Sequence, residues 1–414
     1  MTPDPSSPAV ALPASPVAIG AVPDDRVKPD MRLLGLLALG HMVTDINQGS
    51  LPAILPVLKD VLSLSYAATG MIVLTGNITS SLIQPLFGYF ADKTARRWLL
   101  PLSVLLSSVG LAFMGLAPSY AAVLALIVIS GFGVAAYHPE GYRTATAVAG
   151  DRKATGVSIF STGGNIGIAL GPPLLTVLLT GFGPAGSLGM LVPGVLVAAL
   201  LTAVLPRLSA PPPAAARARA NAAGARTMVG AMGLLILVVA IRSWTQLGFT
   251  TFMPFYWRDV LHGDPRLVGT LLAVFLGAGA IGTLAAGPVA DRIGIRRYVV
   301  SVFLLATPIA VGFLFVQSVP LVFVMLALLG FVLVSTFTVS VVLGQAYLPR
   351  NPGMASGLIV GFAIGAGGLG ASVLGWVADH WGLTATLGIS AVMPVAGFVA
   401  ALFLPDPKPG DVVG

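Results

Sequence analysis

Six ionisable side chains lie inside otherwise apolar segments of this sequence, and their presence there needs a chemical reason. They are His41, Asp45, His138, Glu140, Arg143 and Arg242. A charge in the middle of a hydrophobic segment costs at least about 2.5–3.5 kcal/mol on membrane-insertion scales, so it is retained for a function or for specific packing. Imidazoles and carboxylates can carry protons, and a guanidinium can bind a carboxylate or phosphonate through two parallel hydrogen bonds.

His41 and Asp45 are four residues apart and share one face of a helix, with Gln48 one turn further on. At ~1.5 Å per residue, Asp45 lies about 21 Å into a segment about 42 Å long. A carboxylate that far from water favours its protonated form unless a cation lies close by. We therefore predict proton coupling at His41 and Asp45. The open alternative is a packing network in which these two residues and Asn47 bond to neighbouring helices.

The string His138-Pro-Glu-Gly141 is predicted to interrupt a helix, because proline removes a backbone donor and restricts the residue before it. Glu140 and Arg143 are three residues apart and can pair. Three interpretations stay open: a salt-bridge cluster at an inner gate with Arg96 or Arg97, a protonation site that controls this gate, and a role in packing alone. His138 and Glu140 are therefore two further candidates for proton coupling.

Arg242 is the basic residue placed well inside a segment of the second half of the chain, with Trp244 and Gln246 close to it. These three residues and Asn165 are our candidates for substrate binding. Two other roles for Arg242 remain open: a counter-ion for Asp45 or Glu140, and a side chain that reaches a helix end.

The composition indicates a membrane protein. Hydrophobic residues make up 56% of the 414 residues and charged residues 9%, with a mean hydropathy of +0.94. Ordinary soluble chains carry about 25% charged residues. The absence of cysteine excludes disulfides and thiolate metal sites, and we predict no metal and no cofactor. The net charge of +7 comes from basic residues at segment ends, which argues against a nucleic-acid partner.

A helix that spans a membrane needs about 20 mostly apolar residues. This length predicts twelve spans, near 31–58, 64–91, 98–117, 119–148, 153–181, 185–206, 228–257, 266–290, 298–317, 320–346, 352–379 and 384–404. The expected fold is an all-α membrane protein of two pseudo-symmetric six-helix bundles, over 31–206 and 228–404. We expect a disordered tail at 1–30, a cytoplasmic linker at 207–227 and a cytoplasmic tail at 405–414.

A short signature occurs twice, at Gly88–Arg97 and at Gly287–Arg297, in matching register within the two halves. The repetition indicates a duplicated unit. Each copy places an acid and a basic cluster after a long apolar segment, as in a loop between two spanning helices. The predicted gating residues are Asp92, Arg96, Arg97, Arg143, Asp291, Arg292, Arg296 and Arg297.

Lysine and arginine set the expected orientation. On the predicted topology, 18 of the 22 basic residues fall on one side, three fall on the other and Arg242 lies inside a span. By the positive-inside rule, both termini are expected in the cytoplasm.

The duplicated signature resembles that of the major facilitator superfamily of secondary transporters, over about residues 31–404. Several further strings, in order, resemble the fosmidomycin resistance branch of that superfamily: His41-x-x-x-Asp45, Ser80–Pro85, His138-Pro-Glu140 with Arg143, Ser158-Ile-Phe, Gly163-Gly-Asn165, Gly171-Pro172, Gly353–Gly357, Gly367–Gly370 and Ala378-Asp379-His380. The resemblance implies an inner-membrane exporter that expels a small antibiotic or related compound by proton-coupled alternating access. We expect it to act as a monomer. One departure is Ile127, where many drug/proton antiporters carry an arginine.

Two other classes of protein stay open. A proton-coupled transporter of an organic acid, sugar or other small metabolite has the same expected fold. A membrane enzyme or sensor is disfavoured, because the sequence contains no P-loop and no paired catalytic constellation. Without an ATP-binding motif, ion coupling or facilitated diffusion is the expected driving mode.

Overall fold

The computed structural model describes residues 29–84, 86–87, 96–150, 152–208, 228–349 and 352–406. Within these ranges the chain is helical and contains no strand. The predicted gating residue Asp92 and most of the linker 207–227 lie outside the described residues.

The helices of the first half begin and end within a few residues of most expected spans. They are α1 (Met31–Val61), α2 (Tyr66–Asn77) continued by the π-helix η1 (Ile78–Leu82), α4 (Leu99–Ala112), α5 (Tyr120–Val148), α6 (Lys153–Phe182) and α7 (Leu191–Val204). A 3₁₀ segment, η3 (Gly183–Met190), precedes α7. The first turn of α1 is capped by Asp30, whose side chain accepts from the backbone N–H groups of Arg32 and Leu33.

The second half departs from expectation in two places. Its helices are α8 (Val229–Asp259), α9 (Val268–Ile293), α10 (Ile295–Phe313), α11 (Val319–Val334), α12 (Thr336–Tyr347) and α13 (Pro352–Leu402). The span expected at 320–346 is divided at Ser335 into α11 and α12. The last two expected spans form one element, α13, with a sharp bend at Gly382, where φ is 82° and an L side chain would be strained.

The predicted interruption at His138–Gly141 is wrong, because α5 continues through Pro139 to Val148. Proline inside a helix removes one donor without necessarily ending the helix, since neighbouring helices can support the freed backbone. His138 and Glu140 therefore project from a continuous helix.

Eight helical segments in the described part of the chain are long and apolar enough to cross a membrane. Two of them run for 52 and 38 residues, much more than the about 20 residues that one crossing needs. The protein is therefore a membrane protein of several crossings.

Glycines let α1 and α6 approach closely. A Cβ at Gly163, Gly167 or Gly171 would overlap the backbone of Ala38, Met42 or Ile46, respectively. Small residues at intervals of four form one stripe along a helix and permit such contact. This pairing fixes how α1 is rotated against α6.

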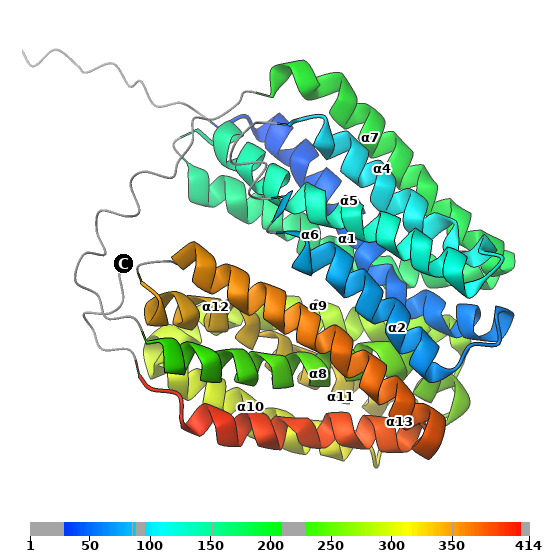
Figure 1. Ribbon diagram of the computed structural model, residues 1–414, viewed down its shortest axis with the longest axis vertical. Helices are drawn as coiled ribbons and strands as arrows, with labels where there is room; N and C mark the ends of the chain where they lie inside the picture. The colour runs from blue at the N-terminus through cyan, green and yellow to red at the C-terminus, as the bar shows by residue number, and fades with distance from the viewer. Residues whose placement is uncertain are drawn as a thin grey trace, which may run out of the picture.

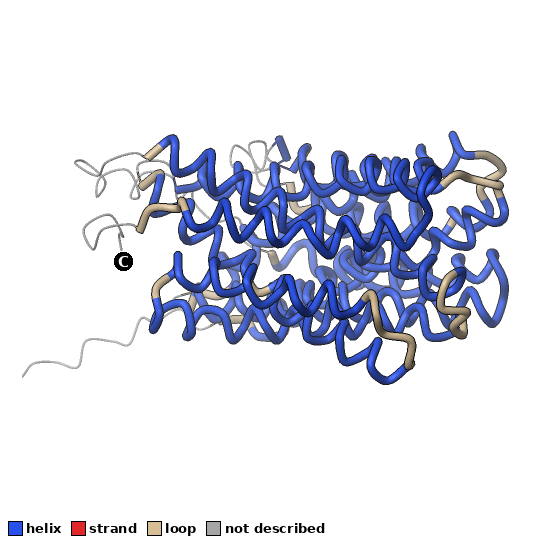
Figure 2. Tube along the Cα trace, turned by 90° about the horizontal axis from the view of Figure 1, so that it is seen from below, coloured by secondary structure: helices blue, strands red, loops and turns tan. Residues whose placement is uncertain are grey.

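The two halves lie side by side (Figures 1 and 2), and in Figure 1 the helices α4 and α7 of the first half are inclined to α8 and α10 of the second. We call the end where α1 and α8 begin the terminal end, and the end where they finish the distal end. One apolar core cluster joins the halves and includes Ile54, Leu175, Phe252, Leu271 and Ala371.

Toward the terminal end each half has its own core, around Leu34 and Tyr137 in the first half and around Leu235 and Tyr347 in the second. In Figure 1 the halves come closest where α2 meets α13. The packing therefore closes the molecule at its distal end.

Candidate functional site

Three of the predicted ionisable residues converge on one buried carboxylate. Asp45 on α1 lies 3.3 Å from Nε2 of His41 through its Oδ2 atom. Its Oδ1 atom lies 3.5 Å from Nε2 of His138 on α5. Asp45 and His41 are each 3% exposed, so the group is shielded from water. We call these three residues the His–Asp–His cluster.

The hydrogen bonds at the opposite ring nitrogens determine the tautomers of both histidines. Nδ1 of His41 lies 2.8 Å from the carbonyl oxygen of Phe160, and Nδ1 of His138 lies 2.8 Å from that of Val134. A carbonyl oxygen only accepts, so each Nδ1 must donate. In a neutral ring, each Nε2 then presents a lone pair to Asp45.

Two lone pairs facing an ionised carboxylate cannot form a hydrogen bond without an added proton. His41 Nε2 and Asp45 Oδ1 are buried and have no hydrogen-bond partner. One proton would satisfy one N···O contact, and a second proton would satisfy the other. This geometry allows a proton to move between an imidazole nitrogen and a carboxylate oxygen of the cluster.

Close packing positions the His41 ring. It stacks on Phe160 of α6, with ring centroids 4.2 Å apart, and meets His138 edge-on at 4.9 Å. Gly164 lies against the His41 ring and the Asp45 carboxylate, and a Cβ there would come within 2.6 Å of both. The glycine leaves the space that these side chains occupy.

The ligand atoms of His41, Asp45 and His138 all lie within 4.8 Å of one another, a spacing that a metal ion can also bridge. Each imidazole nevertheless faces a different carboxylate oxygen. Two separate N···O contacts of this kind suit protons better than a single central ion. We therefore interpret the cluster as a proton site.

Glu140 and Arg143 form an ion pair on α5, with a second contact of 3.3 Å from Nε to Oε2. Glu140 is fully buried, and Arg143 compensates its charge. Two other basic residues of the predicted gate are described: Arg96 is exposed and Arg97 is half-buried.

The second signature lies at the terminal end of α9 and α10. Asp291, Arg292 and Arg297 are exposed. Arg296 donates to the carbonyl oxygen of Leu402 at 2.6 Å and lies 3.7 Å from Asp406. It therefore binds the C-terminal turn of α13, where a cation complements the helix dipole.

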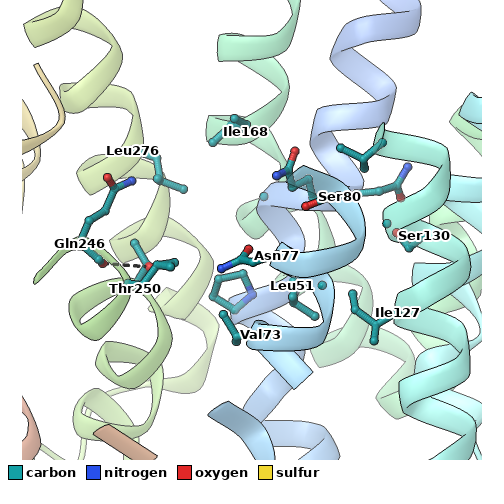
Figure 3. A pocket seen from close by; sticks show the side chains of 18 residues that line it. Leu51, Val73, Asn77, Ser80, Ile127, Ser130, Ile168, Gln246, Thr250 and Leu276 are labelled. Atoms are coloured by element: carbon teal, nitrogen blue, oxygen red, sulfur yellow. Dashed lines mark hydrogen bonds between the residues drawn. The ribbon is translucent and has the colours of Figure 1, made fainter. Parts of the chain in front are cut away.

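A cavity of about 840 Å³, including the space at its open mouth, lies between the halves. Figure 3 shows Gln246 and Thr250 of the second half across from Asn77 and Ser80 of the first. Asn47, two residues after Asp45, and Val134, whose carbonyl receives the His138 bond, also line it. The His–Asp–His cluster and the cavity therefore share helices α1 and α5.

The π-helix η1 shapes one wall of this cavity. Asn77 ends α2, and Ser80 lies within η1. Single π-turns inside α-helices occur frequently at functional sites. Thr79 of this turn packs against Gly131 of α5, where a Cβ would overlap its hydroxyl.

The other predicted substrate residues lie apart from this cavity. Nε and one terminal nitrogen of Arg242 donate to the carbonyl oxygens of Leu333 and Val334, each at 3.3 Å, and its guanidinium lies over the Phe337 ring. The carbonyls at the end of α11 are thereby satisfied. Trp244 packs against Gly370 of α13, and Asn165 is exposed on α6.

Sequence reasoning missed the polar contacts that join the halves at the distal end. Asp379 of α13 accepts from the backbone N–H groups of Tyr66 and Ala67 in the first turn of α2, at 2.7 and 2.9 Å. Arg258 of α8 binds Asp60 of α1 through two nitrogens, at 2.5 and 3.2 Å.

We call these contacts the distal latch. Arg258 also donates from Nε to the carboxylate of the neighbouring Asp259, at 2.6 Å. The sequence contained one signal for Asp379. It is an acidic residue at the end of an apolar segment, on the side of the membrane where few basic residues are predicted.

Two helical halves with a cavity between them are the arrangement of a membrane transporter. The chain belongs to the major facilitator superfamily, whose family model matches residues 37–359 and 235–413. It is a transporter and not an enzyme.

Two curated relatives match nearly the full chain. The fosmidomycin resistance protein of Escherichia coli (strain K12) is 33% identical over 96% of this chain and 98% of its own length. The MFS-type transporter YfnC of Bacillus subtilis (strain 168) is 33% identical over 93% of this chain and 95% of its own length.

Solved structures share the fold at low identity. A bacterial homologue of the human lysosomal transporter Spinster, in an inward-facing and occupied conformation, gives a TM-score of 0.79 at 17% identity, covering 92% of this chain and 98% of that chain. The nucleoside transporter NupG gives 0.67 at 18% identity, covering 90% and 98%.

Proposed function

We propose that this protein is a proton-coupled exporter of a small antibiotic in the bacterial inner membrane. It would cross the membrane twelve times, with both termini in the cytoplasm, as a monomer. The similarity to a fosmidomycin resistance protein supports fosmidomycin or a related compound as the cargo. The His–Asp–His cluster is the observation that carries the proton coupling.

The coupling rests on the short path between the proton site and the cavity. Asp45 and Asn47 are two residues apart on α1, and Val134, whose carbonyl oxygen accepts from His138, lines the cavity. Protonation changes which hydrogen bonds the cluster can form. A rearrangement of α1 against α5 then alters the cavity directly.

The other ionisable groups near Asp45 bind partners other than its carboxylate. Tyr137 donates to the carbonyl of Leu37 at 2.7 Å, and Tyr142 bonds to Ser161 at 3.1 Å. Glu140 and Arg143 are paired on the next turn of α5. Among the described residues that pack around it, His41 and His138 contact the Asp45 carboxylate, so they exchange its proton.

With the termini in the cytoplasm, the observed closure at the distal end corresponds to an inward-facing state. Substrate enters the cavity from the cytoplasmic side and displaces a proton from the cluster. The distal latch then opens, and substrate leaves on the outer side. A proton that enters from outside resets the cluster.

The test is substrate-driven proton movement in proteoliposomes with an entrapped pH dye. We expect antiport in the wild type and no proton movement in Asp45→Asn or His138→Gln. Glu140→Gln should retain coupling, because Arg143 already compensates this carboxylate. Asp264→Asn, on an exposed distal loop, is the matched control.

Substrate exchange without a gradient separates coupling from folding. An Asp45→Asn protein that exchanges substrate but moves no proton supports the proposal. Normal proton antiport in both cluster variants would sink it. If a chelator abolished proton movement and Zn²⁺ restored it, the cluster would instead be a metal site.

A further inference from the structure

The three members of the His–Asp–His cluster differ in their access to water. The side chains of His41 and Asp45 are 4% and 5% exposed, whereas that of His138 is 17% exposed. A proton passes between water and a side chain only where water comes within hydrogen-bond reach of the titrating atom. The two histidines are therefore not equivalent, although both contact the same carboxylate.

Protein groups enclose the His41 ring. Phe160 stacks on one face, and His138 meets the ring edge-on. Its Nδ1 atom is held by the carbonyl oxygen of Phe160, and Gly164 lies against its Nε2 edge. In the described structure, the neighbour from which Nε2 of His41 can take a proton is Asp45.

His138 lies on the face of α5 that lines the cavity. Ser130, Val134 and His138 are spaced by four residues, so they form one stripe of the helix. Ser130 and Val134 line the cavity between the halves. α5 ends at Val148, whose carbonyl oxygen accepts from the backbone N–H of Asp30 just before α1. His138 therefore lies on the terminal side of the cavity.

Tyr142, one further turn along α5, covers this stripe. Helical side chains lean back toward the start of their helix, so the Tyr142 ring lies over the turn that holds His138. The ring meets Phe160 edge-on, with centroids 4.8 Å apart, and its centroid is 6.0 Å from that of His41. Its hydroxyl bonds to Ser161 of α6 at 3.1 Å. Because Tyr142 is itself 37% exposed, one side of it faces the cluster and another lies at the surface.

We propose that His138 is the port through which the cluster exchanges protons with water at the terminal end, and that Tyr142 covers this port. On release, the lone pair of His138 Nε2 takes the proton from Oδ1 of Asp45. A water molecule then takes the proton from Nε2, which regains its lone pair. The Nδ1–H group stays bonded to the carbonyl oxygen of Val134 throughout. This inference rests on the proposed function and names the route by which its proton leaves.

The other ionisable groups around this route have partners of their own. Tyr137 donates to the carbonyl oxygen of Leu37, and Glu140 pairs with Arg143. The part of α6 beside the cluster, residues 160–164, contributes no ionisable side chain. Among the described residues, His138 is therefore the group that can join the cluster to water.

The test is modification of the purified full-length protein by diethyl pyrocarbonate, which attacks accessible unprotonated imidazole nitrogens. The chain has four histidines, so mass spectrometry of its peptides can follow each of them. His262 and His380 are exposed and serve as internal references. We expect His138 to react more slowly than these references. His41 should react at least about tenfold more slowly than His138, because an enclosed group reacts only after local opening.

Two variants test the cover. Tyr142→Ala removes the ring and should speed the reaction of His138 by about tenfold. Tyr142→Phe keeps the ring but loses the bond to Ser161, so the increase should be smaller. His41 should stay protected in Tyr142→Phe, which separates an opened port from general unfolding. Thr202→Val on α7, whose hydroxyl bonds within its own helix, is the matched control and should leave all four rates unchanged.

Three results would overturn the inference. The first is a wild-type protein in which His41 reacts as fast as His138. The second is a His138 that stays unreactive in the wild type and in both Tyr142 variants. The third, an unchanged His138 rate in both variants, would remove Tyr142 from the port.

Failure of this inference and failure of the proposed function give different results, because proton antiport is measured separately in proteoliposomes. Antiport by a protein in which His41 reacts before His138 would keep the transporter and move the port. Selective reaction of His138 in a protein that exchanges substrate without moving protons would keep the access route, and the proton coupling would fail.

Discussion

At the scale of single residues, the His–Asp–His cluster depends on space as much as on charge. His41 and His138 reach one carboxylate because both Nδ1 atoms are held by backbone carbonyls. Gly164 leaves room for the His41 ring and for Asp45. The geometry of the cluster therefore depends on Gly164 as well as on the three ionisable residues.

Gly164→Ala should abolish proton coupling, because the added methyl group must displace His41 or Asp45. Overpacking of this kind costs about 1–3 kcal/mol, so the protein should still fold but unfold at a lower temperature. Gly181→Ala on the same helix is the control, because its Cβ meets nothing within 4 Å. Thermal unfolding and proton flux are measured on both. Unaltered proton flux in Gly164→Ala would contradict the assigned geometry.

At the scale of elements, helix ends are satisfied by side chains from distant helices. Asp379 of α13 binds the first backbone N–H groups of α2, and Arg242 of α8 binds the last carbonyls of α11. Charges of these signs also complement the two helix dipoles. The first contact crosses between the halves, so it stabilises one conformation, whereas the second lies within the second half.

Asp379→Ala should shift the protein toward a state that is open at the distal end. Loss of a helix cap costs about 0.5–2 kcal/mol, enough to change the populations severalfold. The chain has no cysteine, so spin labels at Phe182→Cys and Phe315→Cys can report the distance between the halves. Both positions lie at the distal end and are highly exposed.

The expected result is a longer and broader distance distribution in Asp379→Ala. The neighbouring His380→Ala serves as the control, because His380 bonds only within its own helix turn, to Trp376. An unchanged distribution in Asp379→Ala would mean that apolar packing alone closes this end.

At the scale of the whole molecule, closure is asymmetric. One apolar core cluster joins the halves at the distal end, whereas the terminal end has separate cores. Arg258 and Asp60 add a two-nitrogen ion pair across the same interface. Asp60 is largely exposed, so salt should weaken this pair.

A double-mutant cycle with Asp60→Asn and Arg258→Gln measures that pair. Exposed pairs contribute about 0.2–1 kcal/mol, so we expect a coupling energy in this range at low salt and less at high salt. The same spin-label distances give the population of the closed state for each variant. Arg266→Gln, also exposed at this end, is the control. Strictly additive effects at low salt would exclude the pair from the latch.

The sequence by itself determined the class of fold and most helix positions. Apolar length and the placement of charges are set by the cost of each residue in a bilayer, which depends little on its neighbours. The same cost identified three candidate functional residues in the sequence: His41, Asp45 and His138. The continuity of α5 through Pro139 was missed, because support from neighbouring helices cannot be read from one helix.

Only the tertiary structure decided which of the ionisable residues meet. Residues 45 and 138 come together because the glycine stripe of α6 sets the rotation of α1 and because α5 packs beside it. Packing between helices also brings Arg242 of α8 to the end of α11 and Asp379 of α13 to the start of α2. Helix rotation depends on close packing between residues far apart in the chain, so no local pattern specifies it.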